Sequence, residues 1–153
     1  CSMREPVSKV MKRYNYLLGE LNAVYHEMSL KLGLSDSAMI ILYTICDQGE
    51  RCPLQDICRY SGLSKQTVNS ALRKLEAERV LYLEAAGSRN KTVCLTEKGM
   101  GLAERTVKRI MQAENEIYTS WPEQDVEKYL ELTEHFLTAL QEKAGQMKAG
   151  DGT

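Results

Sequence analysis

The sequence of 153 residues holds few aromatic side chains other than tyrosine, with one tryptophan, one phenylalanine and eight tyrosines. It also lacks any apolar run near the roughly 18–20 residues that a membrane-spanning helix needs. The N-terminal stretch has no apolar segment of the kind that signal peptides carry. We therefore expect a cytoplasmic protein without a membrane partner, and we expect the native chain to start at Met3, after two added residues.

Cysteine is present, but not in the pattern of a disulfide-rich domain. The five cysteines lie at irregular spacing, at positions 1, 46, 52, 58 and 94. An odd number without an export signal argues against a disulfide framework. The sequence also has no CxxC or HxxxH pair, and its two histidines lie far apart, so we expect no bound metal. A metal held by distant ligands that dimer packing brings together is the alternative.

Signatures of catalysis are missing as well. The sequence contains no P-loop, no glycine-rich dinucleotide fingerprint and no GxSxG motif. His135 stands beside Glu134 in an apolar helical pattern, which favours an exposed or interface residue over a catalytic base. We expect neither enzyme activity nor a cofactor.

The composition that remains is that of a globular domain, with 43% hydrophobic and 27% charged residues, and its length suits one domain at residues 3–153. The overall net charge of −1 conceals an asymmetry. Residues 51–100 carry nine Lys/Arg and five Asp/Glu, a net charge of +4, whereas residues 1–50 and 101–153 carry −1 and −4. A local basic block is what phosphate binding needs. Ordinary scatter of surface charge is the alternative.

Apolar residues at steps of three and four predict helices along most of the chain. The first runs from Val7 to Lys31, and a helix of this length near a chain end typically packs against a helix of another chain. The other predicted helices begin after Ser35, at Pro53, at Lys65, after Thr96 and at Pro122. The helix after Thr96 is predicted to run unbroken from about Glu97 to Thr119. Two extended runs, residues 80–86 and 91–96, predict a β-hairpin with its turn at residues 87–90.

Residues 53–79 have the pattern of a helix-turn-helix, with Ser61-Gly62-Leu63-Ser64 as the turn. One face of the second helix is apolar: Val68, Ala71, Leu72 and Leu75. The opposite face offers short polar and cationic groups suited to base edges in the major groove: Ser64, Lys65, Gln66, Asn69, Ser70 and Arg73. No acidic residue lies between Ser64 and Leu75, which favours DNA over the alternative of a solvated surface helix.

The hairpin that follows carries Arg89 at its tip and Lys91 just behind it. A two-stranded wing with a basic tip can contact the DNA backbone or reach into the minor groove. A salt bridge that holds the hairpin to the body is the alternative for Arg89.

At this point residues 61–99, SGLSKQTVNSALRKLEAERVLYLEAAGSRNKTVCLTEKG, resemble the MarR family of winged helix-turn-helix transcriptional regulators, with LTEKG at 95–99 as the most specific match. The resemblance implies a mainly α fold with a small β-hairpin wing. It implies a winged helix-turn-helix lobe at about 35–96 and dimerisation helices at about 7–31 and 97–144. By position it assigns a DNA-binding role to Lys65, Gln66, Thr67, Asn69, Ser70, Arg73 and Arg89. The wing departs from the family's DxR pattern, since its tip reads GSRN.

The resemblance also implies a homodimer that represses transcription from a pseudo-palindromic site on double-stranded DNA. In this reading a small apolar or phenolic effector releases the DNA. The candidate effector-pocket residues are Tyr14, Tyr25, Met28, Tyr43 and Trp121. For each of them, packing in the core or in the dimer is the alternative.

Two other functions stay open from the sequence. A winged helix can serve as a protein-interaction module without DNA binding. A thiol-based redox sensor is the other possibility, with Cys52 as the candidate because a helix N-terminus favours a thiolate.

Overall fold

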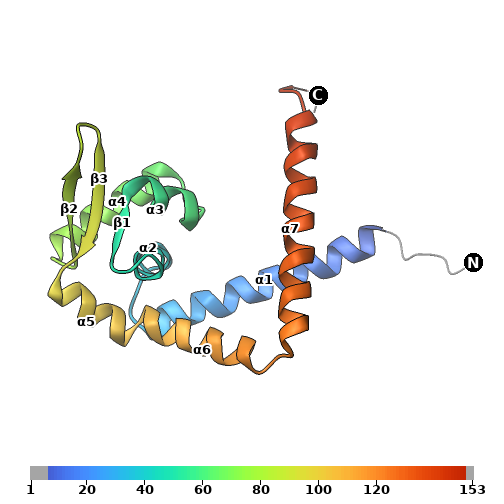
Figure 1. Cartoon of the computed structure of the whole chain (residues 1–153), viewed down its shortest axis with the longest axis horizontal. Coiled ribbons are helices and arrows are strands. Elements are labelled where there is room, and N and C mark those ends of the chain that lie inside the picture. Colours follow the sequence, from blue (N-terminus) through green and yellow to red (C-terminus); the bar gives the residue numbers. More distant parts are fainter. Residues whose placement is uncertain (1–6, 151–153) are drawn as a thin grey trace, which may run out of the picture. The chain divides into compact units, whose positions relative to one another are not determined.

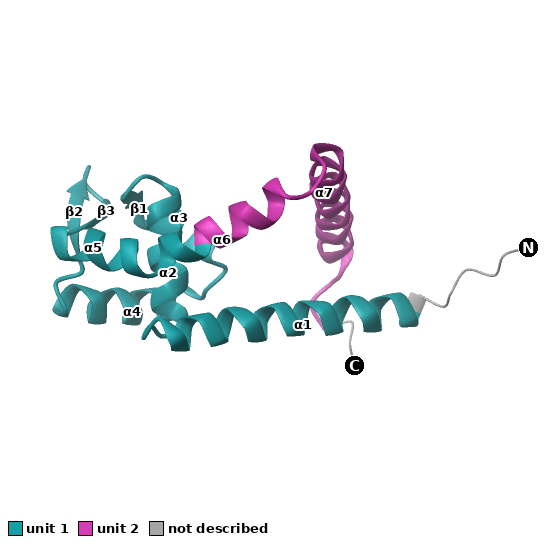
Figure 2. Ribbon diagram, turned by 90° about the horizontal axis from the view of Figure 1, so that it is seen from below, with its two compact units in different colours: residues 1–110 teal, residues 111–153 magenta. Residues whose placement is uncertain are grey.

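The computed structural model describes residues 7–150, which form seven helices and one three-stranded sheet (Figure 1). The helices are α1 (Val7–Lys31), α2 (Asp36–Asp47), α3 (Leu54–Ser61), α4 (Lys65–Ala77), α5 (Glu97–Arg105), α6 (Val107–Thr119) and α7 (Glu123–Gln146). The strands are β1 (Arg51–Pro53), β2 (Leu81–Ala86) and β3 (Asn90–Leu95). The chain divides after Ile110 into two compact units (Figure 2), which are described separately. The expected start at Met3 lies outside the described residues.

Helix α2 is the centre of the first unit. Its run of apolar side chains buries Ile41, Leu42 and Ile45 completely, and residues of α3, α4 and the sheet pack around them in one core. The helix begins where the sequence predicts, because the Ser35 hydroxyl accepts a hydrogen bond from the Ala38 amide at 3.1 Å.

The helix-turn-helix is confirmed, with α3 and α4 joined by a turn in which Gly62 has a φ of 72°. Only glycine adopts this left-handed conformation without steric cost. Ser64 then caps α4 by accepting a hydrogen bond from the Thr67 amide at 3.1 Å. Val68, Leu72 and Leu75 are buried, so α4 turns its apolar face to the core as predicted.

The predicted hairpin of β2 and β3 is present, but it belongs to a sheet with the antiparallel order β1-β3-β2. The third strand, β1, was not expected. Its three residues are too short for an alternating pattern, and Pro53 indicates a helix start rather than a strand end. Cys52, expected at a helix N-terminus, instead lies in β1 opposite Val93.

The single helix expected from Glu97 to Thr119 is wrong, because the helix breaks at Thr106. The Thr106 hydroxyl donates to the Leu102 carbonyl at 2.7 Å, and its amide bonds to Ala103 rather than continuing the α-helical ladder. Such competition between a threonine hydroxyl and the backbone is known to bend helices.

The LTEKG segment fixes the connection between α4 and β2. Thr96 caps α5 by accepting from the Gly99 amide, and its hydroxyl donates to the carbonyls of Arg79 and Val80 at 2.6 and 3.0 Å. Lys98 donates to the carbonyl of Glu78 at 2.8 Å. A side chain at position 99 would overlap the Val80 carbonyl, so α5 can lie against this turn only because residue 99 is glycine.

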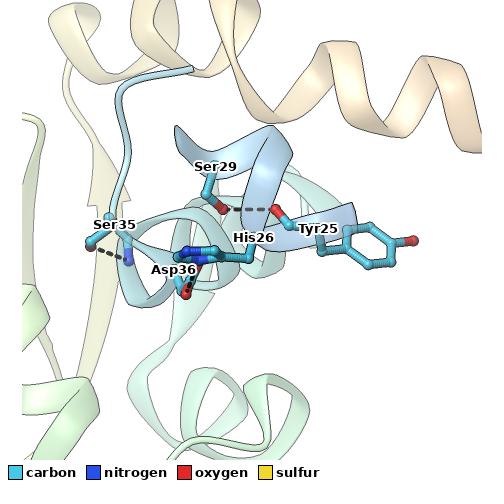
Figure 3. Close-up of polar contacts among 6 residues, drawn as sticks. Tyr25, His26, Ser29, Ser35 and Asp36 are labelled. Carbon is cyan, nitrogen blue, oxygen red and sulfur yellow. Dashed lines mark hydrogen bonds and ion pairs between the residues drawn. The ribbon is translucent and has the colours of Figure 1, made fainter. Parts of the chain in front are cut away.

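The C-terminal end of α1 contacts the start of α2, where His26 Nδ1 lies 2.8 Å from Asp36 Oδ2 (Figure 3). Ser29 is fully buried and donates to the Tyr25 carbonyl. From Ser8 to Val24, by contrast, every residue of α1 is exposed. Within residues 7–150 no single helix has the length and apolar composition to cross a membrane, although the bent pair α1 and α2 passes that test on these two properties.

The second unit contains the end of α6 and all of α7. No residue of α7 is buried, and all are exposed except half-buried Val126. Three aromatic rings hold the two helices together. Tyr118 and Trp121 meet edge to face with their centroids 5.1 Å apart, and Tyr129 lies 6.1 Å from Trp121. Such aromatic pairs stabilise beyond their buried area, so they fix the corner between α6 and α7.

We predict that Gly99→Ala lowers the free energy of unfolding by about 1–3 kcal/mol or more, because the added methyl group displaces α5 from the Val80 carbonyl. The control is Gly101→Ala on the same helix, where the methyl group meets only the end of the Arg105 side chain. Helix propensity should make that variant as stable as the native protein or slightly more so. Urea unfolding measures the free energy of unfolding of both variants. Equal values would show that a methyl group at position 99 does not disturb the contact with the Val80 carbonyl.

Candidate nucleic-acid interface

The residues predicted to bind DNA lie on two elements of the first unit, α4 and the β2–β3 wing. All are exposed except Asn69, which is half-buried: Ser64, Lys65, Gln66, Thr67, Asn69, Ser70, Arg73, Arg89 and Lys91. Those on α4 lie opposite the buried Val68 and Leu72. The structure therefore places a polar and cationic face on the outside of the second helix of the helix-turn-helix.

The N-terminal end of α4 is built to face an anion. Its first turn has no acidic residue, and the unpaired amides of a helix N-terminus attract negative charge. Lys65 adds a full positive charge there. The Ser64 hydroxyl bonds both the Thr67 amide and the Thr67 hydroxyl, so Ser64 serves the fold by capping the helix.

The wing presents Arg89 in its turn. Residues Ala86 and Asn90 close the hairpin, and Gly87 supplies a positive φ of 79°. Arg89 makes no ion pair with any residue in the described range 7–150, so the salt bridge considered as its alternative is absent there. The guanidinium is exposed and available to a phosphate.

Sequence reasoning missed the contacts that support the wing. Arg51 in β1 forms an ion pair with Glu84 in β2 at 2.7 Å. Gln55 in α3 donates from its side-chain amide to the side-chain Oδ1 of Asn90 at 3.0 Å. The partners are 33 and 35 residues apart, so no local pattern in the sequence could have paired them.

Two surface hollows flank α4. One, of about 240 Å³, separates α4 from the wing and is lined by Leu54, Asn69, Leu72, Arg73, Glu76, Leu83 and Lys91. The other, of about 400 Å³, is a shallow depression lined by Ser37, Gln66, Thr67, Ser70, Ala71 and Lys74. The polar residues of α4 therefore border concave surface on both sides of the helix.

The candidate effector residues divide between the two units. Tyr25, Met28 and Tyr43 lie half-buried at the edge of the first unit's core. Tyr14 is exposed on α1, and Trp121 belongs to the second unit, where it packs against Tyr118. None of the five lines either hollow beside α4.

The burial of Cys52 does not favour it as a redox sensor. A sensor thiol needs exposure and a lowered pKa, but Cys52 is fully buried. Burial, helped by the carboxylate of Asp56, raises the pKa of the Cys52 thiol to about 11. Burial also raises the pKa of Cys46. Among residues 7–150, no group of three or more His, Cys, Asp and Glu side chains is arranged to hold a metal ion.

Comparison with known proteins identifies the winged helix. The MarR family model matches residues 32–89. Among curated proteins no relative matches the sequence. The structure is similar to NMB1585, a MarR family regulator from Neisseria meningitidis, with a TM-score of 0.78 and 16% identity over 95% of this chain and 100% of that one.

Two further solved structures are similar. Sco3205, a MarR family transcriptional regulator from Streptomyces coelicolor in complex with DNA, has a TM-score of 0.70 and 15% identity over 100% of this chain and 96% of that one. BpsR from Bordetella bronchiseptica, whose DNA binding is regulated by 6-hydroxynicotinic acid, has a TM-score of 0.53 and 19% identity over 78% of this chain and 98% of that one. These likenesses confirm the predicted fold.

We predict that Cys52 resists alkylation in the native protein at pH 7.5. A thiol whose pKa is about 11 stays protonated far above neutral pH, and the thiolate is the reactive form. Peptide mass mapping after brief treatment with N-ethylmaleimide should show half-buried Cys58 modified before Cys52, and both modified after unfolding in guanidinium. Rapid native modification of Cys52 would restore the sensor hypothesis.

Proposed function

We propose that this chain is a MarR-type regulator, since the MarR family model matches its winged helix at residues 32–89, and that it binds DNA sequence-specifically to regulate transcription, without enzyme activity. The observation that carries the proposal is the exposed face of α4, which is polar, cationic and free of acidic residues from Lys65 to Leu75. Amide side chains such as Gln66 suit adenine edges, and Arg73 suits guanine. The DNA-bound structure of Sco3205 supports the same use of the fold.

The second part of the proposal is a homodimer formed by the long helices. Helix α7 buries none of its residues in the described chain, although one side of it is strongly apolar. The exposed apolar side chains on that side are Tyr129, Leu130, Phe136, Leu137 and Leu140, and half-buried Val126 lies on the same side. Exposed apolar surface of this extent marks an interaction site. The exposed apolar residues of α1, such as Leu17 and Leu21, support a dimer interface in the same way.

Two-fold symmetry would set the spacing of the DNA site. A dimer places two recognition helices in successive major grooves about 34 Å apart, which calls for a pseudo-palindromic operator. Occupation of such a site at a promoter would repress transcription. A small apolar or phenolic effector would release the DNA, as regulation of BpsR by 6-hydroxynicotinic acid suggests. Tyr25, Met28 and Tyr43 are the best-placed residues for it, since each is half-buried against the core of the first unit.

We predict that Arg73→Ala weakens specific DNA binding by about 1–3 kcal/mol, roughly 5- to 150-fold in Kd, through loss of a bidentate base contact. Fluorescence anisotropy with DNA from upstream of the chain's own gene, and with a random-site pool, measures the Kd at two salt concentrations. Native binding should fall steeply with salt, because phosphate contacts release counterions.

Arg109→Ala is the matched control. It removes the same exposed side chain from α6, outside the winged helix, and should leave the Kd within about twofold. The regulator hypothesis fails if the native protein binds neither DNA at low salt. Equal losses in both variants would show that Arg73 contributes only net charge.

We predict that Leu137→Glu converts the dimer to a monomer, because a carboxylate on the apolar side of α7 is costly to bury in a helix–helix interface. Thr138→Glu adds the same charge about 100° farther around the helix and should stay dimeric. Sedimentation velocity at micromolar concentration separates the two masses. A native monomer, or a Leu137→Glu dimer, would contradict the proposed role of α7.

A further inference from the structure

The wing has a supported base and an unsupported tip. Strand β1 pairs with β3 only from Thr92 to Cys94. Beyond Thr92, the hairpin has two strands, which pair Ala85 with Lys91 and Ala86 with Asn90. A two-stranded hairpin without a third strand is marginally stable at best in water. The ion pair of Arg51 with Glu84 does not help the tip, because Glu84 lies opposite Thr92 at the base.

The tip also receives little support from α4. The hollow of about 240 Å³ lies between α4 and the wing, and Lys91 lines it together with Arg73. Successive side chains of a strand point to opposite faces. Asn90 therefore points away from the side of the wing that Lys91 occupies.

On its own side, Asn90 meets α3. The side-chain amide of Gln55 donates to the side-chain Oδ1 of Asn90 at 3.0 Å. Within the described part of the chain, this is the one side-chain hydrogen bond from the tip (residues 85–91) to the body. Gln55 is the second residue of α3, next to Leu54, which packs against the core. Gln55, which α3 fixes to the body, therefore holds Asn90, the residue that directly follows Arg89.

We propose that Gln55 and Asn90 are positioning residues that hold the wing tip so that Arg89 meets the DNA. This inference rests on the proposed DNA-binding function. Neither residue needs to touch DNA in this role, because the hydrogen bond restrains the backbone beside Arg89. Ordering the tip before binding lowers the entropy that DNA binding must otherwise overcome.

The test measures DNA affinity by anisotropy for Gln55→Ala, Asn90→Ala and the double variant, each in the full chain. Loss of one hydrogen bond should raise Kd about two- to tenfold, and the double variant should lose no more than either single variant. The exchanged pair, Gln55→Asn with Asn90→Gln, keeps two amides of the same total length and should recover most of the affinity.

Arg89→Ala supplies the readout that a merely structural role would not change. In the Arg89→Ala background, Gln55→Ala and Asn90→Ala should have no further effect on Kd, because the group they position is gone. Losses that persist in that background would overturn the proposal. So would native affinity in the single variants.

Hydrogen exchange of the DNA-free proteins separates this proposal from the proposed function. Amides of residues 85–91 should exchange faster in Gln55→Ala than in the native protein, whereas those of α4 should not change. Native-like exchange in the tip would overturn the positioning role even if the protein binds DNA. Suppose that the tip exchanges faster in Gln55→Ala than in the native protein, but that the native protein binds no DNA. This result would overturn the regulator hypothesis and the DNA-positioning role, and it would still establish the contact between Gln55 and Asn90.

Discussion

The close approach of Gly99 to the Val80 carbonyl sets the geometry on which the interface depends. Val80 stands in the turn between α4 and β2, so the contact holds the end of one element of the candidate interface and the start of the other. Thr96 and Lys98 add hydrogen bonds to three successive carbonyls of the same turn. Arg79 is held there with a φ of 61°, a conformation that costs a non-glycine residue roughly 1–2 kcal/mol. The surrounding contacts stabilise this strained turn.

The segments that bury their apolar side chains are also those that carry the excess of positive charge. The lobe formed by the helix-turn-helix and the sheet buries its apolar side chains around α2, while most apolar side chains of α7 and α1 are exposed. The excess of positive charge falls in residues 51–100, which form the helix-turn-helix and the wing, and the excess of negative charge falls in residues 101–153. Phosphates would be attracted to the lobe and repelled by the C-terminal third. Net charge near zero for the whole chain is therefore compatible with a DNA-facing surface.

Features that depend on local sequence could be predicted. The bounds of α1 and the caps at Ser35, Ser64 and Thr96 follow from apolar period and capping chemistry, and the structure has them where the sequence places them. Features that depend on distant partners could not. Strand β1 exists because β3 lies beside it, and the burial of Cys52 follows from that pairing. The break at Thr106 involves a single hydroxyl, and the spacing of apolar residues, from which the helix was predicted, gives no sign of it.

The two parts of the interface are held by different kinds of interaction. Helix α4 is fixed by fully buried apolar side chains and by its own cap, so its position is as stable as the core. The wing tip is fixed by a hydrogen bond between exposed side chains, and such bonds contribute only about 0.5–1.5 kcal/mol each. Contacts of this strength let a segment open locally without unfolding the protein. Under the proposed DNA-binding function, substitutions at Gln55 or Asn90 would therefore adjust DNA affinity while leaving α4 in place, and the wing would be the part of the interface where affinity changes at least cost to the fold.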